Sequence, residues 1–278
     1  MQTGNLLIDG VDAFTQYGTY LSDGQLATLL ELPKLKTPTS TEWADQDGME
    51  YDLTAPLLDS RTLSLKFHIR TPEGFYSLIE ALQAGAYHTF NIPSIEPTYT
   101  LRLTQTQSLN ATGNLITASL TFSEDTPTAP TGSPSTSPLI PLTGITLDNT
   151  DLAYYGIQPI EGIRSNILTP LPQREALKVT TCNTAGIALY DSQTVTQKPS
   201  TLTLPLYITA STVTELIRRY HSLLATLLSP NLHIIEAYGH TVQCFYQSIS
   251  ISQFSLKQPL LIYSITLQAV TSKLKENS

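Results

Sequence analysis

The sequence contains an internal repeat, and a chain with such a repeat is expected to fold as two copies of one structure. Residues 7–12 (LIDGVD) correspond to residues 146–151 (TLDNTD), 139 positions later, and a Tyr-Gly pair follows each copy at residues 17–18 and 155–156. The same shift of 139 relates Tyr51-Asp52 to Tyr190-Asp191, and it relates two alternating apolar runs: Leu63, Leu65, Phe67 and Ile69 with Leu202, Leu204, Leu206 and Ile208. Three segments in one register predict a tandem duplication.

Each half shows the same series of secondary-structure signals. Residues 63–70 alternate apolar and polar side chains, the pattern of a strand in a one-sided antiparallel sheet. An amphipathic helix follows in each half, with apolar residues at helical spacing: Phe75, Leu78, Ile79 and Leu82, then Val213, Leu216, Ile217, Tyr220 and Leu224. Three strand-like runs complete each half: His88–Ile92, Tyr99–Thr106 and Leu115–Phe122, then Leu232–Ala237, Thr241–Ile251 and Leu260–Ala269. The sequence therefore predicts a mainly β (α+β) fold.

A segment rich in Pro, Ser and Thr separates the two halves. Such a segment builds no core, and its prolines favour an extended, semi-rigid connector. We therefore predict a first module at residues 1–125, a linker at residues 126–143 and a second module at residues 144–278.

The composition limits the classes of function. Of the 278 residues 41% are hydrophobic, enough for two cores, but only 14% are charged and the net charge is −8. A weakly charged surface favours packing against copies of the same chain. The absence of basic clusters argues against sequence-independent binding of nucleic acid. Neither a signal peptide nor an apolar stretch of about 18 residues occurs, so we expect synthesis in a cytoplasm and no membrane partner.

The search for chemistry predicts no catalytic, cofactor-binding or metal-binding residue, and we expect no enzyme activity. The five histidines lack metal-ligand spacing, and Cys182 and Cys244 are expected to be unpaired core residues, although one bridge is possible. The loop at residues 43–50 fails as a calcium loop, because placing Gly48 at position 6 puts Trp43 at position 1. An Asp47-Gly48 turn is expected there instead. The sequon at residues 110–112 is expected to be an unmodified loop.

Two pairs of carboxylates, Asp9 with Asp12 and Asp45 with Asp47, are conceivable pairs for glycoside hydrolysis. The first pair returns in the second half as Asp148 and Asp151. A turn motif present in both halves is better explained by Asp side chains that hold the backbone than by two active sites.

Together, the opening LIDGVD, the nearby Tyr17-Gly18, the Trp43-x-Asp45-x-Asp47-Gly48 loop and the alternating strand at residues 61–70 resemble phage tail proteins of the distal-tail type, including prophage versions from Bacteroides-like bacteria. The resemblance covers about residues 5–125, and the repeat extends it along most of the chain. It implies tail-tube-like antiparallel β-sandwich modules, each with one flanking helix, that assemble into a ring around a DNA channel. Distal tail proteins usually carry one such module plus a different domain, whereas here the second half repeats the first.

The resemblance also implies the partners: copies of the same chain, as a hexamer or as a trimer with pseudo-sixfold symmetry, and other tail or baseplate proteins. DNA would only pass through, and the protein would be located in the virion after synthesis in the host. The segment at residues 32–59 is the expected subunit contact, with Trp43, Met49, Tyr51 and Tyr190 as candidate interface residues. Trp43 either packs against its own module or anchors a neighbour. The alternative function is a carbohydrate-binding or adhesin-like protein.

Overall fold

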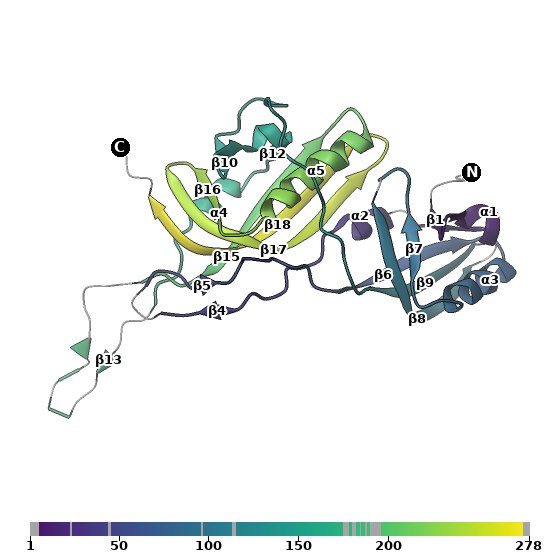
Figure 1. The fold of residues 1–278 in the computed structure, drawn as a ribbon, viewed down its shortest axis with the longest axis horizontal. Coiled ribbons are helices and arrows are strands. Elements are labelled where there is room, and N and C mark those ends of the chain that lie inside the picture. Colours follow the sequence, from purple (N-terminus) through teal and green to yellow (C-terminus); the bar gives the residue numbers. More distant parts are fainter. Residues whose placement is uncertain are drawn as a thin grey trace.

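The computed structural model describes residues 6–22, 24–43, 46–95, 97–112, 115–174, 178–179, 182–183, 185–186, 188–189 and 196–274. It contains two seven-stranded antiparallel sheets, each curled into a half-barrel, and the two lie side by side along the long axis of the molecule (Figure 1). The prediction of a mainly β chain with two similar antiparallel modules is confirmed.

The first strand of the first module begins at Leu7, and the last strand of its sheet ends at Glu124. Its strands pair in the order β2-β1-β7-β8-β9-β6-β3. Their bounds are β1 (Leu7–Ile8), β2 (Val11–Asp12), β3 (Thr19–Leu21), β6 (Arg61–Ile69), β7 (His88–Asn91), β8 (Thr98–Thr112) and β9 (Leu115–Glu124). The helices are α1 (Ala13–Tyr17), α2 (Gln25–Leu30) and α3 (Pro72–Gln83). The sequon at residues 110–112, expected in a loop, lies at the end of β8, because this strand continues past its predicted end to pair with β9.

The second module repeats this order as β11-β10-β16-β17-β18-β15-β12. Its strands are β10 (Ile145–Leu147), β11 (Thr150–Asp151), β12 (Ile157–Pro159), β15 (Ser200–Thr209), β16 (His233–Ala237), β17 (His240–Ser255) and β18 (Leu260–Leu274). Its helices are a 3-10 helix, η1 (Leu152–Tyr155), with α4 (Ile163–Leu168) and α5 (Val213–Leu227). Element for element, the two modules correspond, as a duplication requires.

The correspondence extends to single residues, and positions at the same place in the two modules are called equivalent below. Leu103 of β8 pairs with Phe122, and Tyr246 of β17 pairs with Leu267. On its other side Phe122 pairs with Leu63, and Leu267 pairs with Leu202, the residue that corresponds to Leu63 in the repeat. Each central hairpin then has a bulge, which falls between Leu103 and Gln105 in the first module and between Tyr246 and Ser248 in the second. Leu103 and Tyr246 are therefore equivalent, and so are the bulge residues Thr104 and Gln247.

The predicted amphipathic helices are α3 and α5, and both begin as the sequence indicates. The side chain of Thr71 accepts a hydrogen bond from the N–H of Gly74, and that of Thr212 accepts one from Glu215, so each threonine caps its helix. Both helices place their apolar faces in one continuous core that runs through the two modules. The short helices near the start of each module were not predicted, because four to six residues carry too little periodicity to identify a helix. No helix of the described residues is long and apolar enough to cross a membrane.

The segment between the modules contains no helix or strand and follows the second module. Ser222 on α5 donates a hydrogen bond from Oγ to the carbonyl of Ser133 at 2.7 Å, and the N–H of Leu139 donates to Ala153 O at 2.9 Å. The linker therefore contacts the second module at Ser133 and at Leu139.

Each module also sends out a long arm between its second short helix and its long strand. Arm 1, residues 31–60, carries the ribbon of β4 (Ser40–Thr41) and β5 (Glu50–Tyr51). Arm 2, residues 169–199, carries β13 (Lys178–Val179) and β14 (Ala188–Leu189). Arm 1 runs beneath the second module, whereas β13 lies away from both seven-stranded sheets (Figure 1).

Candidate functional site: the junction between the modules

Arm 1 is bound to the second module by backbone hydrogen bonds along its length. The N–H of Leu35 donates to Gln247 O at 3.1 Å, that of Asn231 to Leu53 O at 3.1 Å, and that of Gly48 to Gln197 O at 3.0 Å. Backbone bonds of this kind fix the course of a loop that has little regular structure of its own. Arm 1 therefore forms part of the second module's surface.

An apolar patch lies beneath this arm. Leu53 packs on Phe245 and Val270 of the second sheet, and the three are between 3% and 5% exposed. The ring of Tyr51 meets that of Phe245 edge-on, with 4.8 Å between centroids. Full burial of a large apolar side chain contributes about 1.5–3 kcal/mol, so this cluster stabilises the contact between arm and sheet.

The tip of arm 1 is held by the base of arm 2. Arg174 donates from Nη1 to Trp43 O at 2.6 Å, donates from Nη2 to Gly48 O, and pairs with Glu42 at 3.3 Å. Gly48 has φ +75°, and a Cβ there would lie 2.7 Å from both Cγ1 and the backbone oxygen of Val270. A glycine is therefore required at this turn for two reasons, its backbone conformation and its close approach to the sheet.

The last residue of α2 and the start of arm 1 are fixed by buried hydroxyls of the second module. Tyr220 on α5 donates to Leu30 O at 3.0 Å, and Tyr246 on β17 donates to Pro33 O at 3.1 Å. Burial raises the pKa of both phenols well above the usual value, so each remains a neutral donor. From the first module, Arg61 donates to Leu29 O at 3.0 Å and pairs with Glu124 at 2.5 Å, which completes the C-terminal end of α2.

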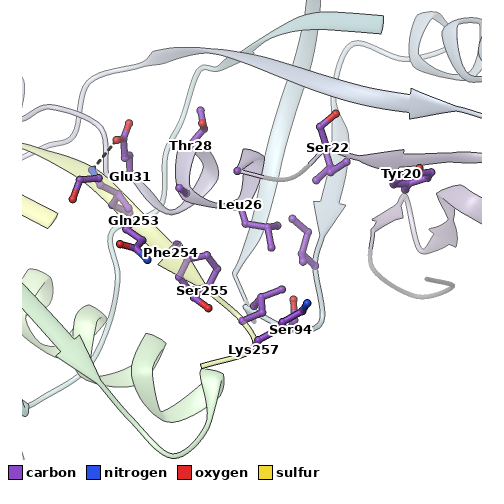
Figure 2. Close-up of a pocket in the computed structure, with 17 residues that line it drawn as sticks. Tyr20, Ser22, Leu26, Thr28, Glu31, Ser94, Gln253, Phe254, Ser255 and Lys257 are labelled. Carbon is purple, nitrogen blue, oxygen red and sulfur yellow. Dashed lines mark hydrogen bonds between the residues drawn. The ribbon is translucent and has the colours of Figure 1, made fainter. Parts of the chain in front are cut away.

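A cavity of about 760 Å³ lies where α2 faces the β17–β18 hairpin. Figure 2 shows Ser22, Leu26 and Thr28 on one side and Gln253, Phe254 and Ser255 on the other. The N–H of Ile251 donates to Glu31 Oε1 at 2.8 Å across this boundary. The lining is a mixture of small hydroxyl and apolar side chains, with Glu31 and Lys257 as its charged groups. Its described lining residues offer hydrogen bonds and include no nucleophile with an adjacent base.

Three of the four candidate interface residues lie in this junction. Tyr51 contacts the second module of its own chain, and its hydroxyl lies 3.6 Å from Sδ of Met49. Trp43 is 48% exposed, so it is not buried in its own module. Its indole N–H donates to Glu50 Oε2 of the same arm at 3.3 Å. Tyr190 lies outside the described residues.

The partners of arm 1 on the second sheet were not predicted. Their signal is a break in alternation: Cys244, Phe245 and Tyr246 are consecutive apolar residues on β17, and Ala269 and Val270 are consecutive on β18. Consecutive apolar residues in a strand indicate that both faces are covered.

The repeated aspartates have structural roles in both modules. Asp9 and Asp148 have left-handed backbones, at φ +51° and +49°, and their carboxylates bind His88 at 2.6 Å and His233 at 2.7 Å. Each also accepts a backbone N–H from the adjacent strand, of Thr89 or of Ile234. The following pair, Asp12 and Asp151, cap α1 and η1. The prediction that these residues hold the backbone is confirmed.

Among the residues that the structure describes, the remaining reactive groups form no catalytic arrangement. His221 is largely buried, which lowers its pKa to about 4, and Cys244 is buried. Cys182 is exposed, contrary to the expectation of a core residue, because it lies on arm 2, outside the two seven-stranded sheets. Asp47 accepts the N–H of Gln197 at 2.9 Å, while Asp45 lies outside the described residues. In the part of the chain that is described, no three His, Cys, Asp or Glu side chains gather as metal ligands.

Comparison of the chain with models of known protein families and with curated proteins finds no match. The function must therefore be argued from the junction itself.

Proposed function

We propose that this chain is a structural component of a phage tail or baseplate, of the distal-tail or hub type. In this proposal, copies of the chain form a ring around a DNA channel and connect the tail tube to the adsorption apparatus. The proposal joins the resemblance of residues 5–125 to distal tail proteins with the architecture of the junction.

The observation that carries the proposal is that one module already packs beside its copy within a single chain. The arm of the first module crosses the sheet of the second through backbone hydrogen bonds and the cluster around Phe245. Two equivalent modules related by one such contact form a heterologous interface, and repetition of a heterologous interface yields a closed ring when the rotation closes. Both proposed stoichiometries, the trimer of six modules and the hexamer of twelve, use this contact.

The net negative charge of the chain is compatible with DNA that passes through the channel without being bound. The sequence has 15 Lys and Arg against 23 Asp and Glu. Strong binding of DNA requires several clustered basic side chains that displace counterions. A channel lined by such a surface would let DNA move through.

Light scattering and negative-stain microscopy on the purified full chain test the proposal. We expect a trimer or hexamer with a central hole. A strict monomer at high concentration that binds glycans would contradict the ring and support the carbohydrate-binding alternative.

That alternative is favoured by the cavity of Figure 2, whose hydroxyl-rich lining of about 760 Å³ suits the hydrogen-bonding groups of a sugar. A glycan-binding screen with the wild-type chain and a Gln253→Ala variant separates the two functions. Binding that depends on Gln253 would favour the carbohydrate-binding protein.

A further inference from the structure

A groove on the first module lies at the place where the second module carries the start of arm 1. Its volume is about 510 Å³, and it runs between the end of α3 and strand β8, lined by Leu82, Gln83, Gly85, Ala86 and residues 102–105. On the second module the bulge residue Gln247 accepts the N–H of Leu35. Its equivalent in the groove is the bulge residue Thr104. On the second module, the segment Leu32–Leu35 therefore lies at the place where the first module has the open groove.

The equivalent of Leu32–Leu35 is the segment Pro170–Gln173 at the start of arm 2. Both segments follow a short helix closed by the same bond, from Glu31 to Ala27 O and from Thr169 to Ser165 O, each at 3.0 Å. Each arm then has an isolated antiparallel β-bridge at its base: Leu35 pairs with Leu58 in arm 1, and Gln173 pairs with Gln197 in arm 2.

The two segments differ in what covers them. Pro33 is buried at the junction and Leu32 is half-buried. On arm 2, Leu171 is half-buried against the core of its own chain, whereas Pro170, Pro172 and Gln173 are exposed. The first module therefore has an exposed groove, and the second has a segment with three exposed residues at the equivalent place.

We infer that the segment Pro170–Gln173 of one copy lies in the groove of the first module of a second copy. This contact repeats between chains the one that Leu32–Leu35 makes within a chain. The inference rests on the proposed function, because it supplies the interface that a ring of these chains needs.

The chemistry of the segment suits the groove. Pro170 and Pro172 have no N–H group, so their burial leaves no unsatisfied backbone donor at these positions. The exposed proline rings are apolar, as is Leu103, the partly buried leucine that lines the groove. The N–H of Gln173 then donates to the carbonyl of Thr104, as the N–H of Leu35 donates to Gln247 O.

Polar groups lie beside the groove. Arg102, which lines it, pairs with Asp125 at 2.8 Å, and the half-exposed Tyr87 donates to Asp125 at 2.9 Å. A polar rim of this kind surrounds the apolar centre of many protein interfaces that form from soluble subunits.

Thiol cross-linking between full-length chains tests the inference. A Gln173→Cys chain and a Thr104→Cys chain, each with Cys182→Ser to remove the exposed native thiol, are mixed at high concentration with a short bis-maleimide. We expect a covalent dimer in the mixture and none with either variant alone. The matched control is the Leu35→Cys, Gln247→Cys double variant, which should cross-link within one chain and remain monomeric.

The outcomes separate this interface from the function. If the control cross-links within the chain and the mixture gives no dimer, the inference is wrong, and rings in negative stain would then mean that another contact builds them. If the mixture gives a dimer while wild-type chains form open filaments, the interface stands and the ring is wrong.

Discussion

The same face of the two modules has opposite chemistry. On the second module the positions beneath arm 1 are Leu232, Phe245 and Val270, an apolar set. The equivalent positions of the first module hold Tyr87, Arg102 and Asp125, which bind one another. Hydrogen bonds from Arg102, Ser123 and Tyr87 hold the pKa of Asp125 well below its usual range, so this face stays charged.

This difference indicates how the two faces are used. A face that its own chain always covers gains stability from apolar side chains, because it never meets water in the folded state. A face that is uncovered until another subunit arrives must stay soluble, and charged and hydroxyl groups serve that need. The two modules share one architecture, which is consistent with a duplication, and the side chains on this face differ between them.

The largest expected effect is the loss of the apolar anchor. Phe245→Ala should lower the free energy of unfolding by about 3–5 kcal/mol, because it removes a buried ring and leaves a cavity under arm 1. The equivalent Arg102→Ala removes part of an exposed polar group and should change unfolding little. Urea unfolding of both variants measures the difference, and equal losses would contradict the contrast between the faces.

The second effect compares the tips of the two arms. Gly48→Ala should cost about 2–4 kcal/mol, since a left-handed backbone is disfavoured for alanine and the new methyl group meets Val270. Gly186 on arm 2 has a similar φ, +84°, but no atom lies within 4 Å of its Cβ position. Gly186→Ala should therefore cost only about 1 kcal/mol. Thermal unfolding of the two variants measures the contribution of packing at Gly48 as the difference between their unfolding midpoints. Equal midpoints would mean that the contact with Val270 contributes nothing.

The sequence predicts the repeated parts of this molecule better than the parts that differ. The shift of 139 residues indicates two equivalent modules, because buried positions such as Leu63 and Leu202 keep their chemistry. The aspartates Asp9 and Asp148 were assigned correctly for the same reason. Arm 1 was recognised as a contact segment, yet its partner was expected in another subunit. A loop sequence does not state which apolar surface it covers, and Phe245 is 194 positions from Tyr51.

A third effect compares the aspartates that begin the first helix of each module. Asp151 accepts backbone N–H groups from Thr143, Gly144 and Ala153, whereas Asp12 caps α1 through Thr15. Asp151→Ala should cost about 2 kcal/mol at pH 7, and Asp12→Ala about 1 kcal/mol. Circular dichroism during urea unfolding measures both, and a larger loss for Asp12→Ala would reverse the expected order.

The contribution of Asp151 also depends on pH. Burial works to raise its pKa, but the hydrogen bonds from Ala153, Thr143 and Gly144 outweigh burial and lower it. Because the pKa is lower in the folded state, the stabilisation is complete above about pH 4 and is lost as the pH falls through the folded value. The gap in stability between wild type and Asp151→Ala should therefore shrink as the pH falls from 5 towards 3. A constant gap over that range would mean that the carboxylate is not favoured by folding.

The smallest effect on folding should accompany the clearest effect on assembly. Ala86 is exposed in the groove of the first module, so Ala86→Trp fills the groove without disturbing the core, and unfolding should change by less than about 0.5 kcal/mol. Assembly measured by light scattering should weaken at least tenfold, because the indole occupies the volume that Pro170–Gln173 of the next copy needs. Ser77→Trp, on the exposed side of α3 and outside the groove lining, places the same side chain on the same module and should assemble as the wild type does. Equal assembly of the two variants would show that the polar face of the first module is simply solvent-exposed, and the contrast between the faces would then reflect solubility alone.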